Sequence, residues 1–103
     1  MAGITTHILD TSKGRPAAGV PVTLEILRDG KWTEVGRGKT DPDGRLRTLT
    51  EGKTLESATY RLTFETGGFF PQVTIAFRVD APGEHYHVPL LLSPFGYSTY
   101  RGS

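Results

Sequence analysis

The sequence predicts an all-β protein, a sandwich or barrel of about eight strands. Short runs of β-branched and aromatic residues recur between clusters of Gly, Pro and Asp, and no stretch has a convincing helical pattern. With 103 residues and 36% hydrophobic content, the chain is expected to form one small domain over residues 1–103. A domain of this size buries only about 60–70% of the surface that its unfolded chain exposes, so self-association is an expected source of further stability.

Four strands are predicted in the N-terminal half, each followed by a loop or turn. They cover 4–10, 20–27, 31–40 and 45–49, with a loop at 11–19, a hairpin turn at Asp29-Gly30 and a tight turn at 41–44. In the first strand, Ile4, Thr6 and Ile8 share one face. Because successive side chains of a strand point to opposite faces, His7 projects away from that face. Arg45 stands where the tight turn leads into the fourth strand.

The C-terminal half predicts four more strands, at 60–65, 73–79, 86–92 and 97–101. In the third of these, alternate positions are apolar and are expected to face the core: Tyr86, Val88, Leu90 and Leu92. His85 and His87 therefore project to the other side. If the last two strands pair through the turn at 93–96, His87 and Tyr100 can lie on one surface, with the terminal Ser103 close behind. His7 would join them if the first strand runs nearby.

Composition excludes several classes of function. Twelve basic and eleven acidic side chains leave a net charge of +1 and are scattered along the chain, so nucleic acid is not an expected partner. The longest apolar stretch, at 88–92, is far too short to cross a membrane. The chain has no cysteine, which excludes disulfides and thiolate zinc sites, and its N-terminus lacks a charged-then-apolar leader. A cytoplasmic, reducing location is expected.

A family resemblance is carried by five segments. They are Thr6-His7-Ile8-Leu9-Asp10, Gly14-Arg15-Pro16-Ala17, Thr40-Asp41-Pro42-Asp43-Gly44-Arg45, His85-Tyr86-His87-Val88-Pro89-Leu90-Leu91-Leu92-Ser93-Pro94 and Tyr100-Arg101-Gly102-Ser103. Over residues 4–103 the chain resembles the 5-hydroxyisourate hydrolases, the transthyretin-related enzymes of urate breakdown. The resemblance implies a transthyretin-like (prealbumin-like) sandwich of two four-stranded sheets. It also implies a homotetramer, a dimer of dimers, whose central channel carries the active sites between subunits.

The implied reaction is hydrolysis of 5-hydroxyisourate to 2-oxo-4-hydroxy-4-carboxy-5-ureidoimidazoline. Matching positions of the family motifs assign His7, Arg45 and His87 as catalytic residues, and His7, Arg45, Tyr100 and Ser103 as substrate contacts. A histidine suits the activation of water because its pKa of about 6.5 lies near working pH. An arginine offers a planar fork of donors for the substrate oxygens and for the developing oxyanion. The individual roles of the two histidines stay open, and no cofactor is implied.

One segment departs from the family pattern. Members of the family usually carry roughly ten more residues, including a short helix, before the Phe-Phe-Pro that opens the sixth strand. Here Thr66-Gly67-Gly68-Phe69-Phe70-Pro71 makes the connection directly. The helix is expected to be missing, which spares the channel residues but puts the stability of the tetramer in question.

Alternatives remain open beside this assignment. His85 and His87 alternate on a strand and could both bind zinc, but no third ligand pattern accompanies them, so no metal is expected and His85 has no assigned role. The same fold also serves as a non-catalytic carrier of small ligands, as in transthyretin, which lacks the two histidines and the arginine. An immunoglobulin-like interaction module and a shortened variant impaired in assembly are further possibilities.

Overall fold

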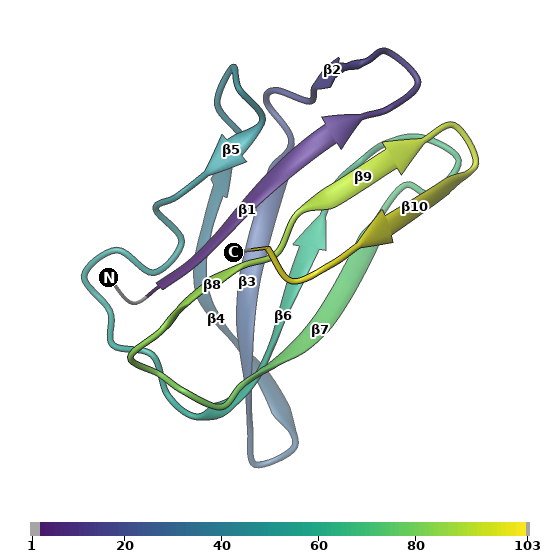
Figure 1. The fold of residues 1–103 in the computed structure, drawn as a ribbon. Coiled ribbons are helices and arrows are strands. Elements are labelled where there is room, and N and C mark those ends of the chain that lie inside the picture. Colours follow the sequence, from purple (N-terminus) through teal and green to yellow (C-terminus); the bar gives the residue numbers. More distant parts are fainter. Residues whose placement is uncertain (1–2, 103) are drawn as a thin grey trace.

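The computed structural model describes residues 3–102, and every regular element within them is a strand (Figure 1). In chain order the strands are β1 (Gly3–Asp10), β2 (Arg15–Pro16), β3 (Pro21–Arg28), β4 (Lys31–Lys39), β5 (Arg45–Leu46), β6 (Ala58–Phe64), β7 (Val73–Val79), β8 (His85–His87), β9 (Leu90–Ser93) and β10 (Gly96–Thr99). The strands form two sheets that pack face to face, so the predicted all-β sandwich without the family helix is confirmed. No helix in this part of the chain is long and apolar enough to cross a membrane.

Strand β1 is the centre of the first sheet. Its order is β10-β9-β1-β2, and β5 and β8 also pair with β1, which makes six strands. The second sheet has four strands in the order β4-β3-β6-β7. Because β1 touches β2, β5, β8 and β9, it brings segments from both ends of the chain together.

The first sheet has more strands than predicted, mainly because the expected strand at 86–92 is divided. Pro89 lies between β8 and β9 and has no N–H to donate to a ladder. The residue before it stays attached to β1, since the Val88 N–H donates to the Thr5 carbonyl over 3.0 Å and the Thr6 hydroxyl donates to the Val88 carbonyl over 2.6 Å. In the predicted loop at 11–19, the two residues of β2 pair with the end of β1.

The core lies between the sheets and follows the predicted alternation. On β1, Ile4, Thr6 and Ile8 are all completely buried, and the buried Thr6 hydroxyl is satisfied by its bond to the Val88 carbonyl. The other sheet contributes its own inward residues: Val22, Leu24, Ile26, Tyr60, Leu62 and Phe64. Each buried aliphatic side chain of this kind stabilises the fold by about 1.5–3 kcal/mol. This packing fixes one face of β1 in the core, and the opposite face points away from it.

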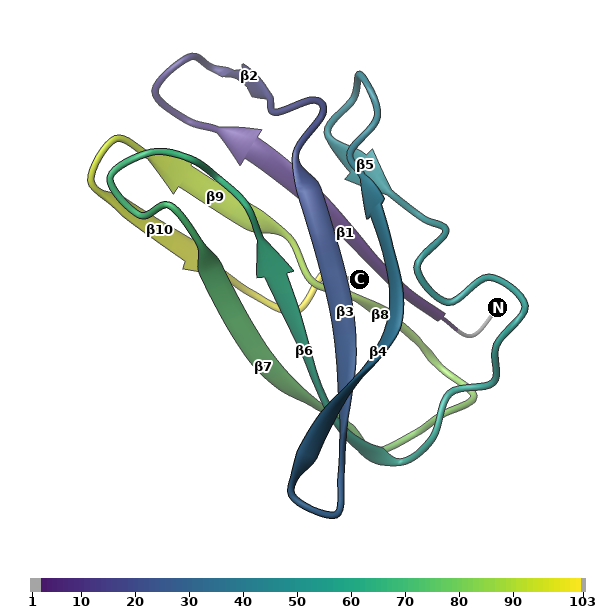
Figure 2. The same ribbon diagram turned by 180° about the vertical axis from the view of Figure 1, so that it is seen from behind.

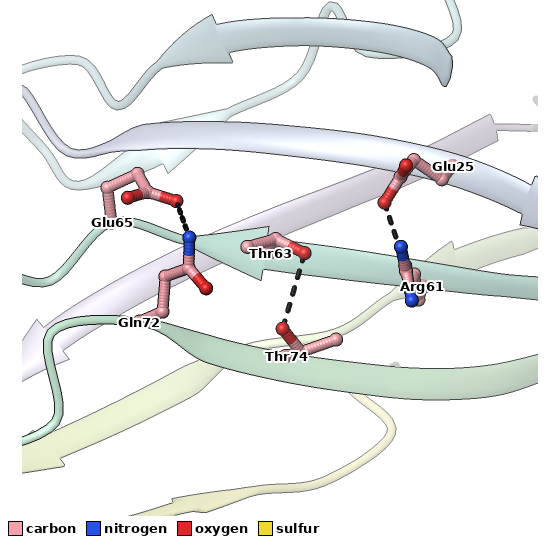
Figure 3. Close-up of polar contacts among 6 residues, drawn as sticks. All are labelled: Glu25, Arg61, Thr63, Glu65, Gln72 and Thr74. Carbon is pink, nitrogen blue, oxygen red and sulfur yellow. Dashed lines mark hydrogen bonds and ion pairs between the residues drawn. The ribbon is translucent and has the colours of Figure 1, made fainter. Parts of the chain in front are cut away.

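The outer face of the second sheet carries cross-strand polar pairs (Figure 3). The Arg61 guanidinium donates to the Glu25 carboxylate over 2.7 Å. Two further pairs connect the neighbouring strands. The hydroxyls of Thr63 in β6 and Thr74 in β7 are 3.3 Å apart, and the Gln72 amide, just before β7, donates to the Glu65 carboxylate, just after β6, over 2.9 Å. Opposed pairs of this type stabilise sheets by about 0.2–1 kcal/mol each, and here they give the outer face of the second sheet a polar character.

The direct connection between β6 and β7 is closed by its own hydrogen bonds. The Gly67 N–H donates to the Pro71 carbonyl over 3.1 Å, and Gly67 has a φ of 72°, a left-handed conformation that favours glycine. The loop lies at the same end of the sandwich as the β9–β10 hairpin (Figure 2). Aromatic rings connect the two, with centroids 5.5 Å apart for Phe69 and Phe95 and 5.4 Å apart for Phe70 and Tyr97. Side chains thus link the two sheets at the end where the helix is missing.

Candidate active site

Three chain segments meet on the outward face of β1. His7 is paired with Arg45 of β5, and Thr5 is paired with His87 of β8. Paired residues of neighbouring strands project to the same side of a sheet, and positions two apart on one strand do so as well. His7, Arg45, His85 and His87 therefore share one face, as the sequence predicts for the histidines.

The turn before β5 fixes both His7 and Arg45. The Asp41 carboxylate accepts from the N–H groups of Asp43 and Arg45, each over 2.9 Å, and the bond from Arg45 lowers the pKa of Asp41. Gly44 completes the turn with a φ of 76°, and a Cβ there would lie only 2.5 Å from the Ile8 carbonyl oxygen. The turn presents the Asp43 carbonyl to Nε2 of His7 at 2.9 Å. Since a carbonyl only accepts, Nε2 of His7 carries the proton in this contact.

His87 is half-buried and is held from two sides. Its Nδ1 lies 2.8 Å from the Thr5 hydroxyl, and its carbonyl accepts the Gly102 N–H over 2.8 Å. Burial of the ring, followed by the charges of Arg45, His7 and His85, lowers the pKa of His87. The neutral imidazole is therefore favoured at neutral pH, which is the form a general base needs.

The tail of the chain is anchored beside His87. The Arg101 guanidinium lies 4.5 Å from the centre of the Tyr86 ring and 3.2 Å from the Glu84 carboxylate. These contacts leave Gly102 against the imidazole, where a Cβ would lie 2.6 Å from Cδ2 of His87. Glycine alone allows this approach without displacing the ring.

A hollow of about 270 Å³ lies over this face. The lining residues are Thr5, Thr6, Arg45, Arg47, His85 and His87. Arg45 and His87 were predicted, His85 had no assigned role, and Thr6 was expected on the opposite face of its strand. Thr5 and Arg47 were not predicted. Alternation along the strands could have found both, since Thr5 is two residues before His7 and Arg47 is two after Arg45. The volume is just below the range of roughly 300–1,000 Å³ that is typical of small-molecule sites.

Not every predicted residue lies at this hollow: His7 projects from the same face of the sheet, opposite Arg45, but is not among the lining residues. The predicted pairing of the last two strands through their turn is present, with Gly96 opposite Ser93. Tyr100, which is 56% exposed, lines a different hollow with residues of β7 and with Tyr86. Ser103 lies outside the described residues. The assignments of His7, Tyr100 and Ser103 to the substrate site stay predictions, as do the catalytic roles of His7, Arg45 and His87.

The arrangement suits hydrolysis of a polar, electron-poor substrate. Imidazoles can take a proton from water and return it, and guanidinium groups can bind carbonyl oxygens that become negative. Among residues 3–102, no group of three or more His, Cys, Asp or Glu side chains is placed to hold a metal ion.

Comparison with known proteins agrees with this fold. The model of the HIUase/Transthyretin family matches residues 4–102. The chain is 46% identical to the 5-hydroxyisourate hydrolase of Salmonella dublin over 97% of this chain and 80% of that protein. It is also 46% identical to the 5-hydroxyisourate hydrolase of Caulobacter vibrioides, with both proteins covered completely.

Solved structures of related proteins have the same fold. The Klebsiella pneumoniae 5-hydroxyisourate hydrolase superposes with a TM-score of 0.82 at 39% identity, covering 100% of both chains. Sea bream transthyretin in complex with thyroxine superposes with a TM-score of 0.89 at 31% identity, covering 96% of this chain and 93% of that one. The strand order, the outward histidines and these matches together establish that the chain belongs to the HIUase/Transthyretin family.

Proposed function

We propose that this protein hydrolyses 5-hydroxyisourate to 2-oxo-4-hydroxy-4-carboxy-5-ureidoimidazoline in urate breakdown. One observation carries the proposal: His7, Arg45 and His87 share a face of one sheet in a chain 46% identical to 5-hydroxyisourate hydrolases. The reaction needs a base for water, donors for an oxyanion and a proton for the leaving nitrogen, and these side chains supply all three.

His87 is the proposed general base. The Thr5 hydroxyl occupies its Nδ1 and leaves Nε2 for the hollow, and the lowered pKa favours the neutral ring. In the proposed step, Nε2 takes a proton from water while the water oxygen forms a bond to a ring carbonyl carbon of the substrate. His87 then returns the proton to the ring nitrogen as the carbon–nitrogen bond breaks.

Arg45 and His7 are the proposed partners of this base. Arg45 donates to the carbonyl oxygen that becomes negative, a role supported by its place opposite His7 in the ladder between β1 and β5. The Nε2–H of His7 donates a hydrogen bond to the Asp43 carbonyl, so in the neutral ring Nδ1 has a lone pair that can accept from the attacking water or from a substrate N–H. Tyr100 and Ser103 are the proposed further substrate contacts.

The proposed assembly is a homotetramer, a dimer of dimers with sites between subunits. Two features support it: the hollow over the histidines is small for a substrate site, and within residues 3–102 no strand pairs with the outer edge of β7 or of β10. The exposed aromatic rings of Phe95, just before β10, and of Tyr97, within it, offer apolar surface at that edge. Light scattering that finds only monomer would refute the tetramer.

The proposed cytoplasmic location is tested separately by cell fractionation.

The activity is tested with freshly generated 5-hydroxyisourate, whose absorbance decays as the ring opens. The protein should accelerate this decay over the spontaneous rate, and alanine at His7, Arg45 or His87 should remove the acceleration. Equal rates with and without protein would refute the enzyme assignment. Binding of a small aromatic ligand without turnover would then favour a transthyretin-like carrier, which the similarity to sea bream transthyretin keeps as the second candidate. Inactive protein that is also monomeric would instead indicate a shortened variant impaired in assembly.

A further inference from the structure

The Thr5 hydroxyl joins two histidines. Its oxygen lies 2.7 Å from Nε2 of His85 and 2.8 Å from Nδ1 of His87, both within hydrogen-bonding distance. The parallel register explains the geometry, because β1 places Thr5 directly opposite His87 and Gly3 opposite His85. The two imidazoles are 6.5 Å apart between centroids and nearly perpendicular, so the hydroxyl is the connection between them.

The single proton of the Thr5 hydroxyl couples the tautomers of His85 and His87. A hydroxyl has one proton to donate, and a neutral imidazole has one N–H and one acceptor nitrogen. If Thr5 donates to one histidine, the other must donate to Thr5 for both contacts to be hydrogen bonds. The tautomer of His87 is therefore tied to the tautomer of His85.

Only one of the two arrangements gives a base in the hollow. In the first, Nδ1–H of His87 donates to Thr5, Thr5 donates to Nε2 of His85, and Nε2 of His87 has a free lone pair. In the second, all donors are reversed and Nε2 of His87 carries a proton. Arg45 and Arg47 line the same hollow and have donors but no acceptor, so they favour the lone pair.

We propose that Thr5 and His85 are positioning residues. They hold His87 as the Nδ1–H tautomer, and they accept its Nδ1 proton during turnover. This inference rests on the proposed function of His87 as the base. When Nε2 takes a proton from water, the Nδ1 proton moves to the Thr5 oxygen as the Thr5 proton moves to Nε2 of His85. His85 is exposed and releases its Nδ1 proton to solvent, which leaves His87 neutral as the Nε2–H tautomer. When Nε2 of His87 gives this proton to the leaving nitrogen, the relay runs in reverse: the Thr5 proton returns to Nδ1 of His87, the Nε2 proton of His85 returns to Thr5, and Nδ1 of His85 takes a proton from solvent.

The surrounding charges favour this transfer. His87 is faced by His7 from β1, by Arg45 from β5 and by His85 from its own strand, and Arg47 lines the same hollow. Each of these groups opposes a positive charge on His87 when it is itself protonated. Movement of the proton to the exposed ring places the charge in water, where it costs less.

The tautomer is tested by NMR of protein with 15N-labelled histidines, at a pH where the rings are neutral. The wild type should have His87 as the Nδ1–H tautomer. Thr5→Val keeps the shape and strand preference of the side chain without the hydroxyl, and it should shift His87 toward the Nε2–H form. Thr5→Ser should restore the wild-type spectrum. The matched control is Thr63→Val, which removes a hydroxyl that contacts Thr74 on the other sheet and should leave His87 unchanged.

Kinetics supply a second measurement. Thr5→Val should lower kcat/KM about tenfold, equivalent to about 1.4 kcal/mol, and Thr5→Ser should recover most of it. His85→Gln keeps a polar group but removes a charge that lowers the pKa of His87, so the acidic limb of kcat/KM should move to higher pH. An unchanged His87 tautomer in Thr5→Val overturns the inference, whatever the activity. A wild type without activity refutes the proposed function instead, because the NMR result does not depend on turnover.

Discussion

Adding one methyl group at Gly102 should damage catalysis without unfolding the protein. A Cβ at this position would lie 2.6 Å from Cδ2 of His87 and 3.3 Å from its Cγ. Two carbon atoms pack best at about 3.5–4.0 Å, so either the ring or the tail must move by roughly 1 Å. The Gly102 N–H is tied to the His87 carbonyl over 2.8 Å, which resists movement of the tail.

The expected loss follows from that displacement. Misplacing a catalytic group by about 1 Å can cost about 100-fold in rate, so Gly102→Ala should lower kcat/KM by about 10- to 100-fold. The melting temperature should hardly change, because Gly102 lies near the chain end and contributes nothing to the core. The assay is the initial rate of decay of freshly generated 5-hydroxyisourate, together with a thermal melt.

The matched control is Gly68→Ala in the β6–β7 loop. A Cβ there meets no atom within 4 Å, and Gly68 does not have a left-handed φ, so its kcat/KM should equal that of the wild type. Two results would refute the reasoning: an unchanged kcat/KM for Gly102→Ala, or a structure of that variant in which the His87 ring has not moved.

Three further perturbations test other parts of the structure. The acidic limb of kcat/KM should have its midpoint below about pH 6.5, because burial and the neighbouring cations lower the pKa of His87. Because the pKa of His87 is lower in the folded than in the unfolded chain, the unfolded chain binds the proton more readily, and the free energy of unfolding should fall as pH drops below about 6.5. His87→Asn should weaken that fall, as measured by urea titrations at several pH values. Arg45→Lys keeps the charge but loses the planar fork, so kcat should fall by about 100-fold in the decay assay; an undiminished kcat would exclude Arg45 as the oxyanion donor. Gly36→Ala places a methyl group against the backbone carbonyl of the buried Leu49, which should cost about 1–3 kcal/mol of stability. An unshifted urea midpoint would contradict the close approach of β4 to Leu49.

Local alternation was sufficient to orient most strands. The inward face of β1, with Ile4, Thr6 and Ile8, is as predicted, because side chains two residues apart must share a face. The division at Pro89 was missed although proline is a known interruption of ladders. The reason is that apolar residues continue in phase on both sides of it, at Tyr86 and Val88 before it and at Leu90 and Leu92 after it.

The candidate site depends on contacts that alternation does not encode. His7 and His87 are far apart in the chain, and only the parallel pairing of β1 with β8 brings them together. That pairing is long-range, so the sequence supported His7 and Arg45 through family resemblance alone. Thr5 was overlooked for a different reason: a threonine on a strand is ordinary, and its role appears only when two imidazole nitrogens are seen on one hydroxyl.

The missing helix should affect assembly before it affects chemistry. The shortened loop closes on itself through Gly67 and Pro71 and packs its aromatic rings on the β9–β10 hairpin, at one end of the sandwich (Figure 2). The proposed catalytic residues instead lie on β1, β5 and β8, fixed by the turn at Asp41 and by the ladder itself. Phe69 and Phe95 remain 68% and 77% exposed, so apolar surface is left beside the free edges of β7 and β10. If sites form between subunits, a defect in this region would appear as activity that rises with protein concentration, whereas a defect in the site itself would lower activity equally at every concentration.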